Sequence, residues 1–296
     1  MVPPPEHPPE RDGVPASGAG RSGASASGYS NPEIPEGINT TDEHPLKEFA
    51  WLGTAVLVAV ALLVMVFGWM GHLAGALVPF ETERKWGVPV AEHFRARDPD
   101  PQVSAYLRDL ADRLIAADPL PEGVSVTVHY DASSMVNAFA TLGGNVVITR
   151  GLLQAMPHEN ALAMVLAHEI AHVRERHVIR ALGRGVLTSI ALAAIGGASG
   201  SDVAGGLIGQ AGFTAGLTFS RSQERDADRI ALRGVYALYG HVAGAETVFE
   251  TLAQVHRHGP PEWLSTHPDS RKRIAAMADE ASRHGWPREG ALTALP

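Results

Sequence analysis

The chain has 296 residues, of which 45% are hydrophobic and 19% are charged, and its formal net charge is −8 at pH 7. This acidic balance offers no basic surface for nucleic acid, so we expect no nucleic-acid partner. The chain has no cysteine, and this absence is compatible with either a reducing or an oxidising compartment.

The first 48 residues are predicted to form a disordered, acidic tail. Residues 1–45 contain nine prolines, six glycines and five serines, with few large apolar side chains. Residues 1–48 contain eight acidic and three basic residues, so the tail carries most of the net negative charge. A segment of this composition cannot bury a hydrophobic core, which predicts disorder.

Residues 49–79 are predicted to form a membrane anchor. The sequence from Phe49 to Phe80 contains no Asp, Glu, Lys or Arg, and about 20 apolar residues suffice to span a bilayer. Trp51 and Trp69 would lie about 27 Å apart along a helix, which matches two interfacial positions. We expect a single-pass protein of a bacterial-type inner or cell membrane. A buried helix of a soluble protein is the alternative.

The charges around the anchor do not determine on which side of the membrane the following domain lies. Lys47 precedes the span, whereas the basic residues that follow it are Arg84, Lys85, Arg95 and Arg97. The positive-inside rule would therefore place the domain in the cytoplasm, but a long folded domain after the span weakens this rule.

Residues 80–296 are predicted to form one domain, mainly α with a small β-sheet (α+β). About 210 residues suffice for one domain with a hydrophobic core. Apolar spacing predicts helices over Pro101–Ala117, His241–Arg257 and Ser270–Arg283.

Two segments are predicted to form strands of the small sheet. Val124–His129 alternates with period two, and Asn145–Thr149 is β-branched and apolar. We expect an edge strand of this sheet to lie beside the helix described next. An exposed edge can pair with an extended peptide, although such strands can equally be purely structural.

The tract Ala167–His172, with sequence AHEIAH, predicts half of a zinc site. His168 and His172 are four residues apart, so on a helix both can face one metal ion. Glu169 would lie beside the water in the open coordination position. Zinc lowers the pKa of such a water toward about 7, so Glu169 is predicted to be the general base.

The motif is expected to lie inside one helix of roughly 25 residues. Pro157 and Glu159 suit its first turn, and Gly183 offers a stop. Apolar residues recur between these ends at Leu162, Val165, Leu166, Ile170 and Val173. A histidine pair without metal on an ordinary helix is the alternative.

The third zinc ligand must come from elsewhere in the chain, because a catalytic zinc normally has three protein ligands. In the metzincin pattern the third histidine would fall at Val178 and the glycine at Glu175, which excludes that arrangement. His177 is nine residues past His168, about 180° around a continuous helix, so it cannot share the metal. We expect His177 to be exposed or to support a ligand from behind.

Glu224 and Asp228 are the best candidates for completing the site. They are four residues apart and therefore share a helical face. One carboxylate would bind the metal, and the other would accept the outer N–H of a liganding histidine. A solvated charged face, laced with neighbouring arginines, is the alternative.

A second apolar tract, Val186–Phe219, carries eight glycines and is interrupted by Asp202. Neither half gives a convincing 20-residue span, and glycine lets helices pack closely. We expect buried or membrane-skimming helices here.

Four motifs occur in an order that resembles a known family. They are NAF at 137–139 leading to GGNVVIT at 143–149, HEIAHVRERH at 168–177, SRSQERDAD at 220–228, and THP at 266–268 followed by Arg273 and Ile274. Over about residues 80–285 the chain resembles the M48 family of zinc metallopeptidases, the Ste24/HtpX/Oma1-like group. Leu142 and Asp226 differ from residues common in the family, but neither is a metal ligand.

The resemblance implies roles for five residues. Glu224 would be the third zinc ligand, and Asp228 would orient a liganding histidine. Asn137, His267 and Arg273 would line the cleft and contact the substrate or the developing oxyanion, whose negative charge a guanidinium or imidazole stabilises.

The sequence therefore predicts a membrane-anchored zinc metalloendopeptidase that holds one Zn²⁺ per chain. Its expected substrates are polypeptides, either unfolded or membrane-associated, and the family alone implies a role in membrane or envelope protein quality control. One alternative is a zinc-bound chaperone-like or scaffold membrane protein with little turnover. A second is a non-protease zinc hydrolase that uses the same motif.

Overall fold

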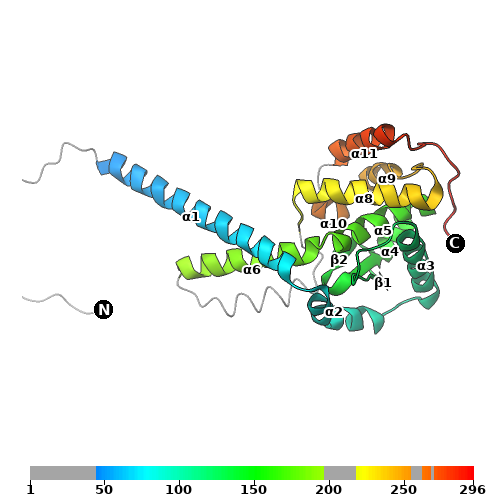
Figure 1. The fold of residues 1–296 in the computed structure, drawn as a ribbon, viewed down its shortest axis with the longest axis horizontal. Helices are drawn as coiled ribbons and strands as arrows, with labels where there is room; N and C mark the ends of the chain where they lie inside the picture. The colour runs from blue at the N-terminus through cyan, green and yellow to red at the C-terminus, as the bar shows by residue number, and fades with distance from the viewer. Residues whose placement is uncertain (1–44, 197–217, 255–261, 268–269) are drawn as a thin grey trace, which may run out of the picture. The chain divides into compact units, whose positions relative to one another are not determined.

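The computed structural model describes residues 45–196, 218–254, 262–267 and 270–296 (Figure 1). The predicted disordered tail lies almost entirely outside the described residues. By its contacts the chain divides into residues 1–50 and 51–296, and the second unit holds every element below except the start of the first helix.

The first helix, α1 (Pro45–Leu77), is the one candidate membrane span among the described residues, judged by length and composition. Its apolar stretch Leu46–Leu77 has a mean hydropathy of 2.6, and none of the most apolar window is buried. At 32 residues it is about 48 Å long, which exceeds the roughly 30 Å of a bilayer's hydrocarbon core.

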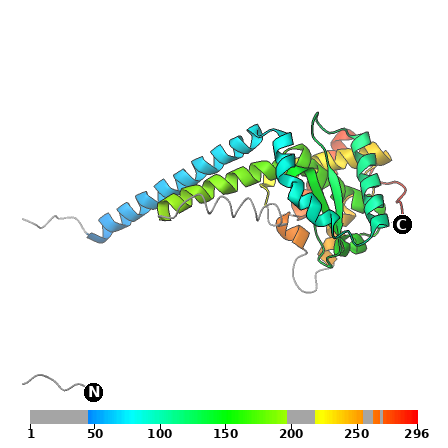
Figure 2. The same ribbon diagram turned by 90° about the horizontal axis from the view of Figure 1, so that it is seen from below.

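The end of α1 packs closely against α6 (His177–Gly196), and Figure 1 shows the two helices crossing near this end and diverging away from it. Figure 2 shows the same pair from below. A Cβ atom added to Gly71 would lie 2.2 Å from the carbonyl oxygen of Gly183, and one on Gly75 would lie 2.5 Å from that of Ile179. Only glycine permits this approach.

The predicted helices in the second apolar tract are described only as far as Gly196. Residues 183–190 of α6 are half-buried. The rest of the tract, residues 197–217, lies outside the described residues.

The expected small sheet is present and has three strands in the order β1-β3-β2. β3 (Asn145–Thr149) lies in the middle, parallel to β1 (Thr127–Asp131) and antiparallel to β2 (Ala138–Thr141). Every residue of β3 is buried, which explains its continuous apolar run. The mainly helical fold class with a small sheet is confirmed.

The helix α2 (Phe80–Arg95) supports the turn that joins β2 to β3. This turn is a short 3₁₀ helix, η1 (Leu142–Gly144), in which Gly143 and Gly144 both have φ of 76°. Gly87 of α2 touches it so closely that an added Cβ would lie 2.3 Å from the Leu142 carbonyl oxygen. The Asn145 side-chain amide donates to the carbonyls of Gly87 (3.2 Å) and Leu142 (2.7 Å).

Replacing Gly87 with Ala should therefore destabilise the domain by about 1–3 kcal/mol, the usual cost of forcing extra atoms into a packed contact. Gly234 is the matched control, because it is also helical but has open space around an added Cβ. Gly234→Ala should stabilise by about 0.5–1 kcal/mol. The midpoint of thermal unfolding in detergent micelles would test both changes, and equal midpoints for the two variants would contradict the close packing at Gly87.

The remaining helices pack around one hydrophobic core. Their bounds are α3 (Pro101–Ala117), α4 (Arg150–Ala155), α5 (Glu159–Arg174), α8 (Arg221–Tyr239), α9 (Thr247–Gln254), α10 (Glu262–Thr266) and α11 (Ser270–His284). All residues of α5 from Glu159 to Val173 are buried, and α5 packs against α8, α3 and β2. The helix that carries the histidine motif is thus the centre of the fold.

The prediction of one 25-residue helix around this motif is wrong. The helix α5 ends at Arg174, and α6 begins at His177. Arg176 between them has φ of 58°, a left-handed conformation that stops the α-helix and turns the chain. At the other end, Pro157 precedes the helix, and the His158 ring caps it by accepting the N–H of Ala161 (3.1 Å).

Helix predictions that rest on local end signals agree best with the structure. α3 has the predicted bounds because Asp100 caps it by accepting two N–H groups, and Pro101 occupies its first position. α11 extends one residue past its prediction. α9 is shorter than predicted, because its regular turns start at Thr247 rather than His241.

Candidate metal centre

Four buried side chains from three parts of the chain converge on one point. His168 and His172 come from α5, Glu224 from α8, and His267 from the residue that follows α10. One ligand atom of each lies within 4.8 Å of all the others, and each residue is at most 3% exposed. The two histidines and the carboxylate predicted as metal ligands are therefore brought together, and His267 joins them. We call these four residues the metal group.

The spacing of these atoms suits a metal of zinc size. His168 Nε2 lies 3.1 Å from His172 Nε2 and 3.4 Å from Glu224 Oε2, and His172 Nε2 lies 3.6 Å from Glu224 Oε1. Tetrahedral bonds of about 2.0–2.2 Å would put neighbouring ligand atoms about 3.3 Å apart. The nitrogen and oxygen donors are also of the type that zinc prefers.

The local charge also favours a divalent cation. Glu169, Glu224 and Asp228 are buried carboxylates, and Arg273 is the buried guanidinium beside them. Three negative charges against one positive charge leave an excess of two, which a low-dielectric interior does not tolerate without compensation. A doubly charged metal ion would balance the group.

Asp228 fixes the orientation of the His168 ring. Its Oδ1 lies 3.0 Å from His168 Nδ1, so this nitrogen donates outward and Nε2 is left to face the other donors. Asp228 is itself held by Arg273, whose Nε and Nη2 lie 2.7 Å and 2.6 Å from its two oxygens. This chain of contacts sets which histidine nitrogen faces the metal group.

The protonation preferences of the group reflect the same electrostatics. Burial alone would lower the pKa of His168, but hydrogen bonds to Asp228 and Glu224 outweigh it and raise the pKa to about 9. Burial would likewise raise the pKa of Glu224, but its hydrogen bonds to His168 and His267 hold it well below the usual range. Such an environment favours positive charge at its centre.

His177 supports His172 from behind. Its Nδ1 lies 3.0 Å from His172 Nδ1, and it is only 4% exposed. Burial lowers the pKa of His177 to about 4, so its ring is neutral at pH 7. The helix breaks at Arg176, so His177 does not lie on the far side of a continuous helix as predicted, but it still lies outside the group of four.

The predicted base, Glu169, is held between the sheet and α10. Its Oε2 accepts the backbone N–H of Ala140 (3.0 Å), and its Oε1 accepts the indole N–H of Trp263 (3.0 Å). Glu169 is fully buried. Sequence reasoning missed Trp263, because its only signal is that it lies four residues before His267.

The residues predicted to line the cleft occupy different environments. Arg273 contacts Glu224 Oε2 (3.2 Å) as well as Asp228, and its Nη1 donates to the His267 carbonyl (3.0 Å). His267 Nδ1 lies 2.9 Å from Glu224 Oε1, inside the donor group. Asn137 is 1% exposed, and its Oδ1 has no hydrogen-bond partner among the described residues.

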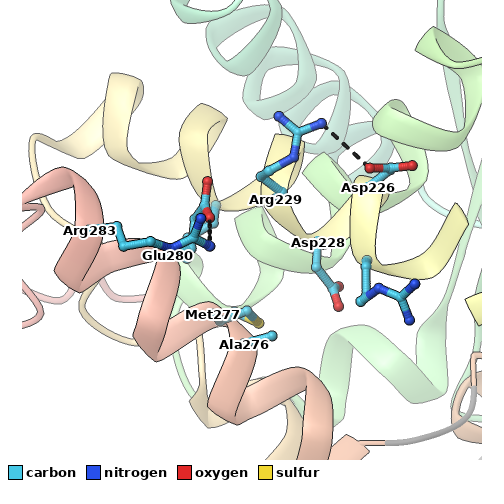
Figure 3. A pocket seen from close by; sticks show the side chains of 9 residues that line it. Asp226, Asp228, Arg229, Ala276, Met277, Glu280 and Arg283 are labelled. Atoms are coloured by element: carbon cyan, nitrogen blue, oxygen red, sulfur yellow. Dashed lines mark hydrogen bonds and ion pairs between the residues drawn. The ribbon is translucent and has the colours of Figure 1, made fainter. Parts of the chain in front are cut away.

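A pocket of about 150 Å³ lies between α8 and α11, next to Asp228. Figure 3 shows Asp228 projecting from α8 toward α11, between the Arg229–Asp226 and Arg283–Glu280 ion pairs. Among its lining residues, Asp228 is the one that contacts His168. The pocket therefore reaches the four donor residues only through Asp228, and Glu169, the predicted base, does not line it.

Four donors that could hold a metal ion, with a buried carboxylate beside them, are the arrangement typical of metallopeptidases. Residues 100–281 match the family described as Peptidase family M48. This match covers more than half of the chain, and the chain belongs to the M48 family. The M48 family membership that the sequence predicted is therefore confirmed.

Proteins similar to this chain carry related names. The beta-barrel assembly-enhancing protease of Yersinia pestis is 31% identical over 236 residues, which cover 72% of this chain and 47% of that relative. The protein of the same name in Escherichia coli (strain K12) is 31% identical over 232 residues, with the same coverage. The mitochondrial metalloendopeptidase OMA1 of Schizosaccharomyces pombe is 32% identical over 182 residues, 60% of this chain and 52% of that relative. The chain thus spans about half the length of the curated relatives it matches.

Proposed function

We propose that the protein is a membrane-anchored, zinc-dependent metalloendopeptidase that hydrolyses unfolded or membrane-associated polypeptides in membrane or envelope protein quality control. The observation that carries this proposal is the position of Glu169. Its carboxylate is fully buried beside the metal group and is oriented by two N–H donors, as a general base must be. The names of the relatives, which include a beta-barrel assembly-enhancing protease and a metalloendopeptidase, support the substrate class.

The proposed organisation places residues 49–79, most of which lie in α1, as the transmembrane anchor and residues 80–296 as the peptidase domain. Of the predicted tail, residues 1–48, only the last four residues are described, and they begin α1. The exposed apolar surface of α1 supports the anchor, because each large side chain from Leu46 to Leu57 is more than half exposed. The bilayer is the partner that would cover it.

His168, His172 and Glu224 would hold one zinc ion, with Asp228 as the residue that orients His168. A bound zinc ion would polarise the scissile carbonyl and lower the pKa of a bound water to about 7. Glu169 accepts a proton from the attacking water and delivers it to the leaving amine. The N–H groups of Ala140 and Trp263 keep this carboxylate in place through both transfers.

The β2 strand would bind the extended substrate. It forms one edge of the sheet, with its other side paired to β3. The Ala140 N–H points from this edge to Glu169, so main-chain groups along the edge lie beside the base. A peptide that pairs with β2 would therefore place a scissile bond at the base with little dependence on its side chains.

Asn137, His267 and Arg273 would act on the substrate or on the oxyanion. Asn137, just before β2, has no partner for its Oδ1 within the described part of the chain, which supports a role in accepting a substrate N–H. The Arg273 guanidinium, close to Glu224, would offset negative charge that appears in the transition state.

The position of His267 supports the alternative of a zinc-bound scaffold with little turnover. Four protein donors fill a tetrahedral shell, as in structural zinc sites, whereas a catalytic zinc keeps one position open. A scaffold needs the ligands but not the base. Loss of function in His168→Ala together with full function in Glu169→Gln would favour it.

The proposed activity is tested with the full-length chain purified in detergent micelles. We expect it to cleave denatured casein, to lose activity with a zinc chelator, and to regain activity when zinc is added back. Magnesium added in place of zinc is the control, because three nitrogen or carboxylate donors at this spacing suit zinc better. Cleavage that persists in metal-free protein would overturn the proposal.

A further inference from the structure

We infer that Glu83 and Arg176 form a positioning pair, which sets the metal helix α5 and the substrate-binding strand β2 at their working distance. This inference rests on the proposed function, because it concerns the geometry of the same reaction. Neither residue touches the metal group or the substrate edge. Both act through the segments that carry these groups.

Arg176 occupies the joint at the end of the metal helix. It is four residues past His172 and directly precedes His177, which supports His172. Its left-handed φ of 58° is unusual for a residue with a side chain. Such strain persists only where surrounding contacts hold the residue in place.

The contacts that hold Arg176 come from the α1–α2 joint. Its Nε and Nη2 lie 2.8 Å and 2.7 Å from Glu83 Oε2, and Nη2 also donates to the Val78 carbonyl (2.9 Å). Its guanidinium lies over the Phe80 ring, 5.4 Å from the centroid. The end of the metal helix is therefore tied to the segment that follows the anchor.

Glu83 also reaches the end of β2. Its second oxygen, Oε1, accepts the backbone N–H of Gly143 (3.3 Å) in the turn directly after β2. The Glu83 side chain is 4% exposed, and burial raises its pKa, while Arg176 and the Gly143 N–H oppose this rise. One buried carboxylate therefore contacts the joint after α5 with one oxygen and the turn after β2 with the other.

This shared carboxylate has a specific kinetic consequence. A substrate that pairs with β2 is held by β2, whereas the metal ligands and Glu169 are carried by α5. A shift between the two segments would misplace the scissile bond relative to the base without removing the pairing groups. Misplacement by about 1 Å can cost about 100-fold in rate, so kcat should fall while KM changes little.

The test uses the full-length chain in detergent micelles, with denatured casein as substrate. Glu83→Gln removes the charge at nearly constant shape. Arg176→Gly removes the guanidinium but suits the left-handed backbone, so the turn itself is preserved. Asp118→Asn is the control, because Asp118 also forms ion pairs at the end of α5, with Arg174 (3.3 Å) and with Arg233 of α8 (2.8 Å), but contacts neither the turn after β2 nor the segment that follows the anchor.

We expect kcat to fall by about 10- to 100-fold in Glu83→Gln and in Arg176→Gly, with KM within about twofold and unchanged zinc content. The double variant should lose no more than either single variant, since both remove the same pair. Asp118→Asn should keep the wild-type kcat.

Wild-type kcat in folded Arg176→Gly would overturn the inference, as would losses that multiply in the double variant or a change confined to KM. If Glu83→Gln fails to fold, Arg176→Gly decides. An inactive wild-type chain would refute the proposed function itself, which separates the two failures.

Discussion

Glu169→Gln is expected to lower kcat on denatured casein by about 10²- to 10⁴-fold while the protein keeps its metal. The reason is that an amide cannot take the proton of the attacking water, whereas the ligands His168 and His172 are untouched. The backbone N–H of Ala140 and the indole N–H of Trp263 each donate to one carboxylate oxygen of Glu169. In Glu169→Gln one of these donors would face the amide NH₂ and lose its acceptor, which should cost about 1–3 kcal/mol of stability. Zinc content by elemental analysis and initial rates per folded protein would measure both effects.

Glu159→Gln is the matched control for this experiment. Glu159 is a buried carboxylate on the same helix, and its two oxygens accept the hydroxyl groups of Tyr106 and Tyr239 at 2.8 Å each. Its loss of charge should reduce stability by a similar amount but leave the rate per folded molecule unchanged. Full cleavage activity in Glu169→Gln would show that Glu169 is not the general base.

Glu224→Gln is expected to weaken zinc binding by more than about 100-fold, because even residues that only support a ligand contribute 10- to 100-fold. The substitution removes the anionic donor from the group of four and reduces the negative charge that favours a cation. Activity should disappear in dialysed protein and return partly at high zinc concentration. Titration with a competing zinc chelator would measure the affinity.

The control for this prediction lies two residues along the same helix. The side chain of Asp226 is 53% exposed, and its partner is Arg229. Asp226→Asn changes the charge of α8 by the same amount outside the metal group, so zinc affinity should stay within about twofold of wild type. Equal affinities in the two variants would mean that Glu224 is not the third ligand.

The parts of the fold that the sequence predicts are those with local causes. Two histidines four residues apart share a face of any helix, and Asp100 followed by Pro101 starts α3 wherever the domain places it. The β3 strand is predicted with the correct bounds because a short buried strand needs a continuous apolar run.

The remaining features depend on contacts between distant segments. Glu224 follows His172 by more than fifty residues, so spacing alone did not decide between Glu224 and Asp228 as the ligand. The left-handed Arg176 is stabilised by Glu83 and Val78, far away in sequence, and nothing local marks it. The four residues of β2 are too few to show the alternation that predicts a strand, although Ala140 among them donates a hydrogen bond to Glu169.

The glycine contact between α1 and α6 bears on how copies of this protein can meet in a membrane. Gly71 and Gly75 are spaced as in the small-residue motif through which many transmembrane helices dimerise. Here that face is covered by Gly183 and Ile179 of the same chain. Self-association through the anchor would therefore have to use another face, such as the one that carries Trp51, Val58 and Leu62. The small-residue face joins the anchor to its own peptidase domain instead.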